Sequence, residues 1–146
     1  MKALCVYAKE KNINILVENH GWLSSNGKLV KRVMEGVDMD NCGTLPDFGN
    51  FCVKRKDQAR WGECEEEYDK YIGMKELMPY AKGVSAKSYD FDEAGNETTL
   101  DYNKMMQIVE DANFEGYIGV EYEGKEPMQG IKATKALLEK IINKSN

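Results

Sequence analysis

Three acidic residues, Glu18, Asp47 and Glu121, each stand at the end of a short apolar run, and their placement indicates a divalent metal site. A carboxylate at a buried strand end is costly unless it is paired or binds a metal. Several convergent carboxylates also repel one another, and a divalent cation removes that repulsion. Oxygen ligands suit Mn²⁺ or Mg²⁺, whereas an added imidazole shifts the preference toward Mn²⁺, Co²⁺ or Zn²⁺. One such residue alone is more often a surface loop residue or a helix N-cap, but three at corresponding strand ends favour the metal site.

Short apolar runs that alternate with helical patterns would position these carboxylates. Strands joined by crossover helices pair in parallel, so their carboxyl ends meet at one edge of the sheet, where ligands bind in such folds. Spacings of about 30 to 40 residues between corresponding strand ends fit one βα unit each. Strands are expected at residues 13–18, 42–47, 83–89 and 117–121, and helices at residues 2–11, 28–37, 74–81, 102–109 and 131–142.

The predicted fold class is α/β, a parallel (β/α) barrel of about four βα units in a single domain over residues 1–146. An eight-unit barrel needs about 250 residues, so this chain is expected to form half of one. Four units alone leave strand edges and part of the core exposed. A homodimer, or pairing with an N-terminal half barrel encoded elsewhere, would cover them. The alternative is a truncated, non-catalytic fragment.

Composition narrows the class of partner. The formal net charge is −5, so there is no basic field to hold a phosphate backbone, and no nucleic-acid partner is expected. No apolar run approaches the roughly 20 residues of a membrane span. The first residues are too short and too polar a stretch for a signal peptide, and a cytoplasmic location is expected.

The cysteines and the longest irregular segment give weaker signals. Cys5, Cys42, Cys52 and Cys64 share no CxxC spacing, so neither a zinc knuckle nor a disulfide framework is predicted, and they are expected to be cytosolic thiols, mostly buried. Residues 52–67 are charged and irregular, and they predict a long loop of the kind that forms functional lids or disordered segments.

Four stretches together resemble the last four strands of the xylose isomerase-like TIM-barrel family. They are VENHG at 17–21, GTLPDFGNF at 43–51, VSAKSYDFD at 84–92 and IGVEYEG at 118–124. This family includes sugar phosphate isomerases and epimerases, and endonuclease IV-type repair enzymes share its fold. The resemblance runs over essentially the whole chain, and it implies the C-terminal half of the barrel.

The resemblance implies a role for each strand-end residue. Glu18 would be a metal ligand and one acid/base, Asp47 a ligand, and Glu121 a ligand and the opposing acid/base. The third strand of the family usually carries a His-x-Lys pattern whose histidine completes the site. Here the pattern is Ser85-Ala86-Lys87, so Ser85 occupies the ligand position as a neutral, weak donor, and a water can replace the imidazole.

Other side chains near these positions are candidates for contact with the substrate. Lys87 would share a face with Ser85, as a catalytic group or as the partner in an ion pair. His20, the only histidine, follows Glu18 on the same face and is a candidate substrate or metal contact, or a structural group. Glu123 shares a face with Glu121, as a supporting partner or a solvated rim residue.

The remaining candidates lie after the second strand. Asn50 resembles a position that contacts substrate in the family, and capping of a turn is its alternative role. Trp61, in the segment predicted as a long loop, would cover a sugar ring, although Trp61 and Trp22 are equally suited to packing over the barrel rim.

These residues predict a metal-dependent isomerase or epimerase of a small sugar or sugar phosphate. Glu18 and Glu121 would exchange a proton beside the carbonyl of a ketose or aldose through a metal-stabilised enediolate. The alternatives are the non-catalytic half barrel and a metal-dependent phosphodiesterase of the endonuclease IV-like type. The scarcity of histidines and the acidic charge count against the phosphodiesterase.

Overall fold

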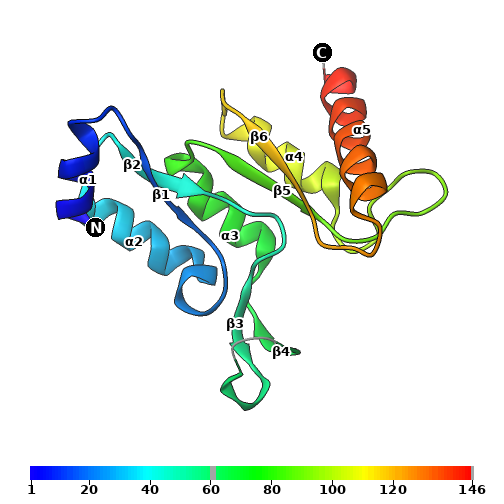
Figure 1. Ribbon diagram of the computed structural model, residues 1–146, viewed down its shortest axis with the longest axis horizontal. Helices are drawn as coiled ribbons and strands as arrows, with labels where there is room; N and C mark the ends of the chain where they lie inside the picture. The colour runs from blue at the N-terminus through cyan, green and yellow to red at the C-terminus, as the bar shows by residue number, and fades with distance from the viewer. Residues whose placement is uncertain (60–61, 146) are drawn as a thin grey trace.

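A computed structural model describes residues 1–59 and 62–145 of the chain. Strand β1 (Ile15–Glu18) pairs in parallel with β2 (Cys42–Leu45), and β5 (Val84–Ser88) pairs in parallel with β6 (Ile118–Tyr122). Parallel bridges from Thr44 to Ala81 and from Asp47 to Ser85 join the two pairs, which gives the order β1-β2-β5-β6 (Figure 1). The predicted α/β class with parallel strands is confirmed.

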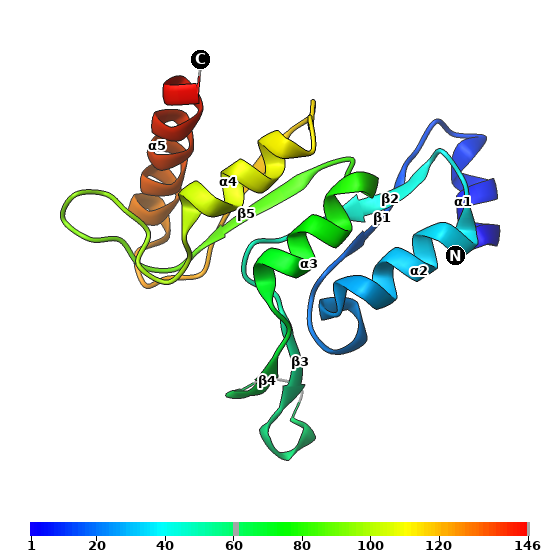
Figure 2. The same ribbon diagram turned by 180° about the vertical axis from the view of Figure 1, so that it is seen from behind.

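Crossover helices cover one side of these strands, and Figure 2 shows α2, α3 and α4 in a row along it. Side chains cap three of the helices: Asn26 accepts a hydrogen bond from Leu29 N–H, Asp69 from two backbone N–H groups of α3, and Asp101 from Lys104 N–H. The helices are α1 (Lys2–Lys9), α2 (Gly27–Val37), α3 (Lys70–Leu77), α4 (Tyr102–Asp111) and α5 (Pro127–Ser145), with 3₁₀ turns at Trp22–Ser25, Lys56–Gln58 and Met78–Tyr80.

The third helix departs most from its predicted bounds of 74–81. Its start lies earlier because Asp69 supplies the N-cap. Its end lies earlier because the chain tightens into the 3₁₀ turn Met78–Tyr80, which carries a proline near its start.

The core lies between the helices and the strands. Phe48 packs edge-on against Tyr102 of α4, with ring centroids 5.5 Å apart. The turn that follows β2 therefore carries core aromatic residues as well as the candidate ligand Asp47. Fully buried apolar side chains of this core include Phe48, Phe51, Met74, Leu77 and Met105.

The segment 52–67 was wrongly predicted as an irregular loop. It forms an antiparallel hairpin of β3 (Cys52–Arg55) and β4 (Cys64–Glu67), which projects away from the other strands (Figure 1). Opposite charges lie across it, since Lys54 pairs with Glu65 and Lys56 pairs with Glu63. Such cross-strand pairs stabilise strands that have no apolar face, which explains why hydrophobic patterning missed the hairpin.

The prediction that all four cysteines are free thiols was also wrong. Cys52 and Cys64 form a disulfide that joins the two hairpin strands, with their Cα atoms 5.8 Å apart. Cys5 is buried and Cys42 half-buried, and both are free cysteines as predicted. The ladder pairs Cys52 with Glu67 and Cys64 with Arg55, and the register is irregular between these pairs. The sequence spacing of the two cysteines therefore gives no sign that they lie within bonding distance.

The sheet ends in two open edges. Within the described residues, β1 pairs only with β2 and β6 pairs only with β5. Apolar side chains near both edges are exposed, among them Leu16 and Tyr117, the latter 92% exposed. The chain thus forms an open part of a barrel. In the described part of the chain, none of the helices is long and apolar enough to span a membrane.

Candidate metal centre

The three predicted carboxylates converge. One oxygen from each of Glu18, Asp47 and Glu121 lies within 4.8 Å of the others. Glu18 ends β1, Asp47 follows β2, and Glu121 lies in β6, opposite Lys87 of β5 in the register. The convergence follows from the parallel order, because all four strands point their carboxyl ends to the same edge.

Asp47 is the most deeply placed of the three, with a fully buried side chain. Its Oδ1 accepts hydrogen bonds from the backbone N–H groups of Gly49 and Asn50, each 2.9 Å long. Its Oδ2 is buried and has no hydrogen-bond partner among the described residues. Burial raises the pKa of Asp47 to about 7, although the nearby Lys87 ammonium lowers it. An unpartnered buried oxygen among carboxylates fits a hard divalent cation, which prefers oxygen ligands.

Ser85 lies inside the same cluster. It bridges to Asp47 in the sheet, and its Oγ donates a 2.8 Å hydrogen bond to Glu121 Oε2. Burial alone would raise the pKa of Glu121, but hydrogen bonds from Lys87 and Ser85 outweigh it and hold the pKa below its usual range. The serine therefore orients Glu121.

Lys87 is buried beside these carboxylates with 0% of its side chain exposed. Its Nζ lies 2.9 Å from Glu121 Oε1, 3.0 Å from Glu123 Oε1 and 3.1 Å from Asn50 Oδ1. An ammonium has three N–H donors, and each has an acceptor here. Burial disfavours the charged lysine, but the carboxylates around it raise its pKa. The geometry thus shows the ion pair that was one of its two predicted roles, and it also brings in Glu123.

Asn19 is a residue of this site that the sequence did not single out. It is fully buried, and its Nδ2 donates to the carbonyl oxygens of Asp47 and Asn50, while its Oδ1 accepts from Asp47 N–H at 2.7 Å. Ser25 Oγ also donates to the carbonyl of Asn50. These bonds fix the turn after β2. The only sign of Asn19 in the sequence was a polar residue between Glu18 and His20. The residues to which it donates hydrogen bonds lie 28 and 31 positions further along the chain, so the sequence could not reveal them.

The predicted substrate contacts divide into three cases. Asn50 joins the cluster through Lys87, and its Nδ2 is buried without a hydrogen-bond partner among the described residues. The side chain of His20 is exposed. Among the described residues, the side chains that converge as potential metal ligands are the three carboxylates, and His20 is not one of them. Trp61 lies outside the described residues. The roles of all these residues stay predictions.

Parallel strands that end in a cluster of carboxylates are a feature of metal-binding (β/α) barrels. Comparisons with known proteins identify the family of barrels to which the chain belongs. The family model described as the xylose isomerase-like TIM barrel matches residues 1–142. The chain therefore belongs to the xylose isomerase-like TIM barrel family.

Two solved structures share this fold. One is a 3-keto-D-glucoside 4-epimerase from E. coli in its apo form, with a TM-score of 0.67 and 13% identity, matched over 95% of this chain and 50% of the epimerase. The other is a probable 3-DHS dehydratase from Bacillus anthracis, involved in petrobactin synthesis. Its TM-score is 0.65 with 17% identity, over 94% of this chain and 53% of the dehydratase. At these identities the likeness shows the fold alone.

A curated relative is the C-glycoside deglycosidase alpha subunit of Arthrobacter globiformis. It is 28% identical over 78 residues, which cover 48% of this chain and 22% of that protein. The chain thus matches about half the length of the solved structures and less of this relative.

Proposed function

We propose that this chain is the metal-binding half of an enzyme that transfers a proton at the carbon beside a sugar carbonyl. The carboxylate cluster carries the proposal, above all the buried Asp47 Oδ2 that lacks a partner among the described residues. Glu18, Asp47 and Glu121 would hold Mg²⁺ or Mn²⁺, with Ser85 or a water at the fourth position. When bound, such a cation would stabilise negative charge that develops on a substrate oxygen.

The protein's own residues would then supply the proton transfer. Glu18 and Glu121 come from the two outer strands, so they approach a bound substrate from different sides. One would remove a proton and the other would return one, which yields an epimer or an isomer. Lys87 and Ser85 hold Glu121 in its ionised form, and an ionised carboxylate is what a general base requires.

The names of the relatives support a sugar substrate. The E. coli structure is that of a keto-glucoside 4-epimerase, and C4 is the neighbour of the keto carbon in its named substrate. The Arthrobacter protein is named for C-glycosides. A keto-sugar or a glycoside is therefore the substrate class that we propose.

The test combines metal analysis with proton exchange. Purified protein should bind Mn²⁺ or Mg²⁺, and a panel of keto-sugars in deuterated water should reveal one that gains deuterium beside its carbonyl. Glu18→Gln should abolish that exchange and leave the circular dichroism spectrum unchanged. Full exchange activity in the variant would refute the proposal.

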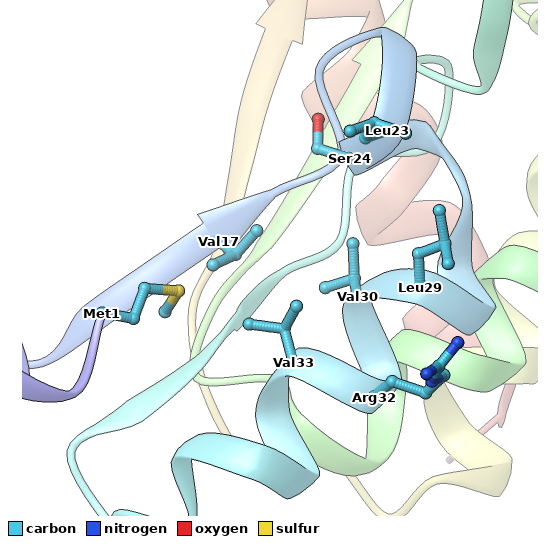
Figure 3. A pocket seen from close by; sticks show the side chains of 8 residues that line it. All are labelled: Met1, Val17, Leu23, Ser24, Leu29, Val30, Arg32 and Val33. Atoms are coloured by element: carbon cyan, nitrogen blue, oxygen red, sulfur yellow. The ribbon is translucent and has the colours of Figure 1, made fainter.

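We further propose that the open edges pair with a complementary half barrel and not with a second copy of this chain. Val17 of β1 faces Val30 and Val33 of α2 across an apolar cavity of about 570 Å³ (Figure 3). This cavity gives an incoming element an apolar surface beside the open edge of β1, and the exposed Leu16 adds an apolar side chain on the opposite face of that strand.

The helices argue against a second copy. In a right-handed parallel ring, each helix covers the groove between the strand before it and the strand after it. In a ring of two copies, α5 of one copy follows β6 and α1 of the other precedes β1, so both would cover the same seam. A partner of four strands that begins and ends with a strand avoids that conflict, because it adds no second helix at either seam.

Light scattering and hydrogen exchange test this arrangement. The isolated chain should have the mass of a 16.6 kDa monomer, and amides of β1 and β6 that face the open edges should exchange quickly. A stable dimer with those amides protected would contradict the pairing that we propose.

A further inference from the structure

Two free thiols lie at the end of the strands opposite to the carboxylate cluster. Cys42 begins β2, whereas Asp47 follows that strand, and α1 lies beside this end of the strands (Figure 1). Cys5 of α1 is 0% exposed, and Cys42 is half-buried. The side chains of the two cysteines share a hydrogen bond, and Cys42 Sγ lies 3.9 Å from Met34 Sδ of α2. Two thiols in contact are the groups from which a disulfide forms.

We propose that Cys5 and Cys42 are a redox-active pair whose oxidation to a disulfide fastens α1 to the start of β2. The oxidant is a small disulfide of the glutathione type. The Cys42 thiolate attacks this disulfide and releases one small thiol, and the Cys5 thiolate then attacks Cys42 Sγ and releases the second. The two protein thiols are oxidised, the small disulfide is reduced, and the two thiol protons end on the released thiols.

The backbone around the pair is already held in place. Asn41 is buried, and its Nδ2 donates to the carbonyl oxygen of Cys5 at 2.8 Å and to that of Ile13 at 3.2 Å. The carbonyl of Asn41 in turn accepts from Ile15 N–H in β1 at 2.8 Å. The asparagine thus holds the backbone of Cys5 against the residue that precedes Cys42. A disulfide between the two cysteines would therefore shorten an existing contact without a large movement of the backbone.

The helix that carries Cys5 has little else to hold it. Within α1 only Cys5 and Ala8 are buried, whereas Leu4, Val6 and Tyr7 are each more than half exposed. A helix of eight residues is marginal in water without tertiary contacts. A covalent bond at the most deeply buried side chain of α1 should therefore strongly reduce local opening of this helix.

The hairpin disulfide is an internal reference for the rate of oxidation. Cys64 of that pair lies in an exposed strand, whereas Cys5 is fully buried. Burial, and next the hydrogen bond with Cys5, raise the pKa of Cys42 to about 11. Because the thiolate is the attacking form, little of Cys42 is reactive near neutral pH. The pair at α1 should therefore close more slowly than the pair in the hairpin.

The first experiment follows both pairs in the full, unaltered chain. The reduced protein is incubated with oxidised glutathione, samples are alkylated in guanidinium chloride at intervals, and the linked peptides are mapped by mass spectrometry. We expect the Cys52–Cys64 link first and the Cys5–Cys42 link later, about tenfold more slowly or slower still, with dithiothreitol reversing both. If Cys5 and Cys42 stay alkylatable, or if Cys42 keeps a bound glutathione, the proposal is overturned.

Two variants isolate the pair at α1. The double variant Cys52→Ser with Cys64→Ser leaves Cys5 and Cys42 as its cysteines, and Ellman's reagent should detect both thiols before oxidation and neither afterwards. Cys5→Ser removes the second attacking thiol, so Cys42 should retain glutathione as a stable mixed disulfide. Failure of Cys42 to take up glutathione in a folded Cys5→Ser variant would contradict the proposed route. If Cys5→Ser does not fold, the double variant and the unaltered chain decide.

Hydrogen exchange tests whether the bond fastens the helix. In the double variant, oxidation should slow amide exchange in α1 by about tenfold or more, because the bond restrains local opening. The amides of α4, which carries neither cysteine, are the control and should exchange at the same rate in both forms. A Cys5–Cys42 bond that forms and leaves exchange in α1 unchanged would refute the proposed tether.

Discussion

The strand-end cluster and the β3–β4 hairpin are both rich in carboxylates, but they use them differently. In the hairpin, Glu65 and Glu63 are exposed and each pairs with a lysine across the strands. In the cluster, the side chain of Asp47 is fully buried, and one of its oxygens has no partner among the described residues. Exposed pairs add little to stability because water screens them. Buried carboxylates with a spare oxygen are costly, and they are kept where a ligand can use them.

The largest difference should appear when a lysine is removed from each region. Lys87→Met leaves Glu121 and Glu123 without their buried cation and should lower the free energy of unfolding by about 3–5 kcal/mol. Lys54→Met removes only an exposed pair and should cost less than about 1 kcal/mol. Urea unfolding of both variants measures the two losses. Equal losses would mean that burial does not distinguish the two regions.

Metal affinity should separate the regions next. Asp47→Asn replaces a buried anionic oxygen ligand by a neutral amide and should weaken Mn²⁺ binding on the order of 100-fold, because the loss of one negative charge weakens the attraction for a divalent cation. Glu65→Gln in the hairpin is the matched control and should leave the affinity unchanged. Calorimetry with Mn²⁺ gives both values. An Asp47→Asn variant that binds Mn²⁺ normally would place the cation elsewhere.

The sequence predicted the cluster well and the hairpin poorly, for physical reasons. Glu18, Asp47 and Glu121 converge because parallel strands end together, and apolar runs reveal such strands. The hairpin has no apolar face, and a backbone ladder and the Cys52–Cys64 disulfide join its strands, neither of which a hydrophobic periodicity reveals.

Contacts between distant residues were equally out of reach. The bonds of Asn19 to the turn after β2, and the orientation that Lys87 imposes on the Asn50 amide, depend on three-dimensional proximity. The ion pair of Lys87 could be predicted as an alternative, because a buried lysine rarely stays unpaired.

The disulfide gives a prediction confined to the hairpin. Cys52→Ser removes the cross-link, which closes a loop with a sequence separation of 12 residues. The loss of stability should be about 2 kcal/mol, as expected for a short loop. Limited proteolysis should then cut the hairpin first, while Mn²⁺ affinity stays within about twofold of that of the unaltered chain. A large loss of Mn²⁺ affinity would show that the hairpin and the cluster are energetically coupled.

The smallest expected effect is a pH dependence of stability in the metal-free protein. Burial raises the folded-state pKa of Asp47 from 3.8 to about 7. Between these values the folded chain holds a proton that the unfolded chain has lost, so the contribution of Asp47 to stability falls as the pH rises through this window and levels off above pH 7. From pH 6 to pH 8 the unaltered chain should lose about 1 kcal/mol relative to Asp47→Asn, which cannot ionise. Urea unfolding of both proteins in EDTA measures the difference. A difference that is constant with pH would mean that Asp47 is ionised throughout, stabilised by Lys87 as the exposed hairpin carboxylates are by their lysines.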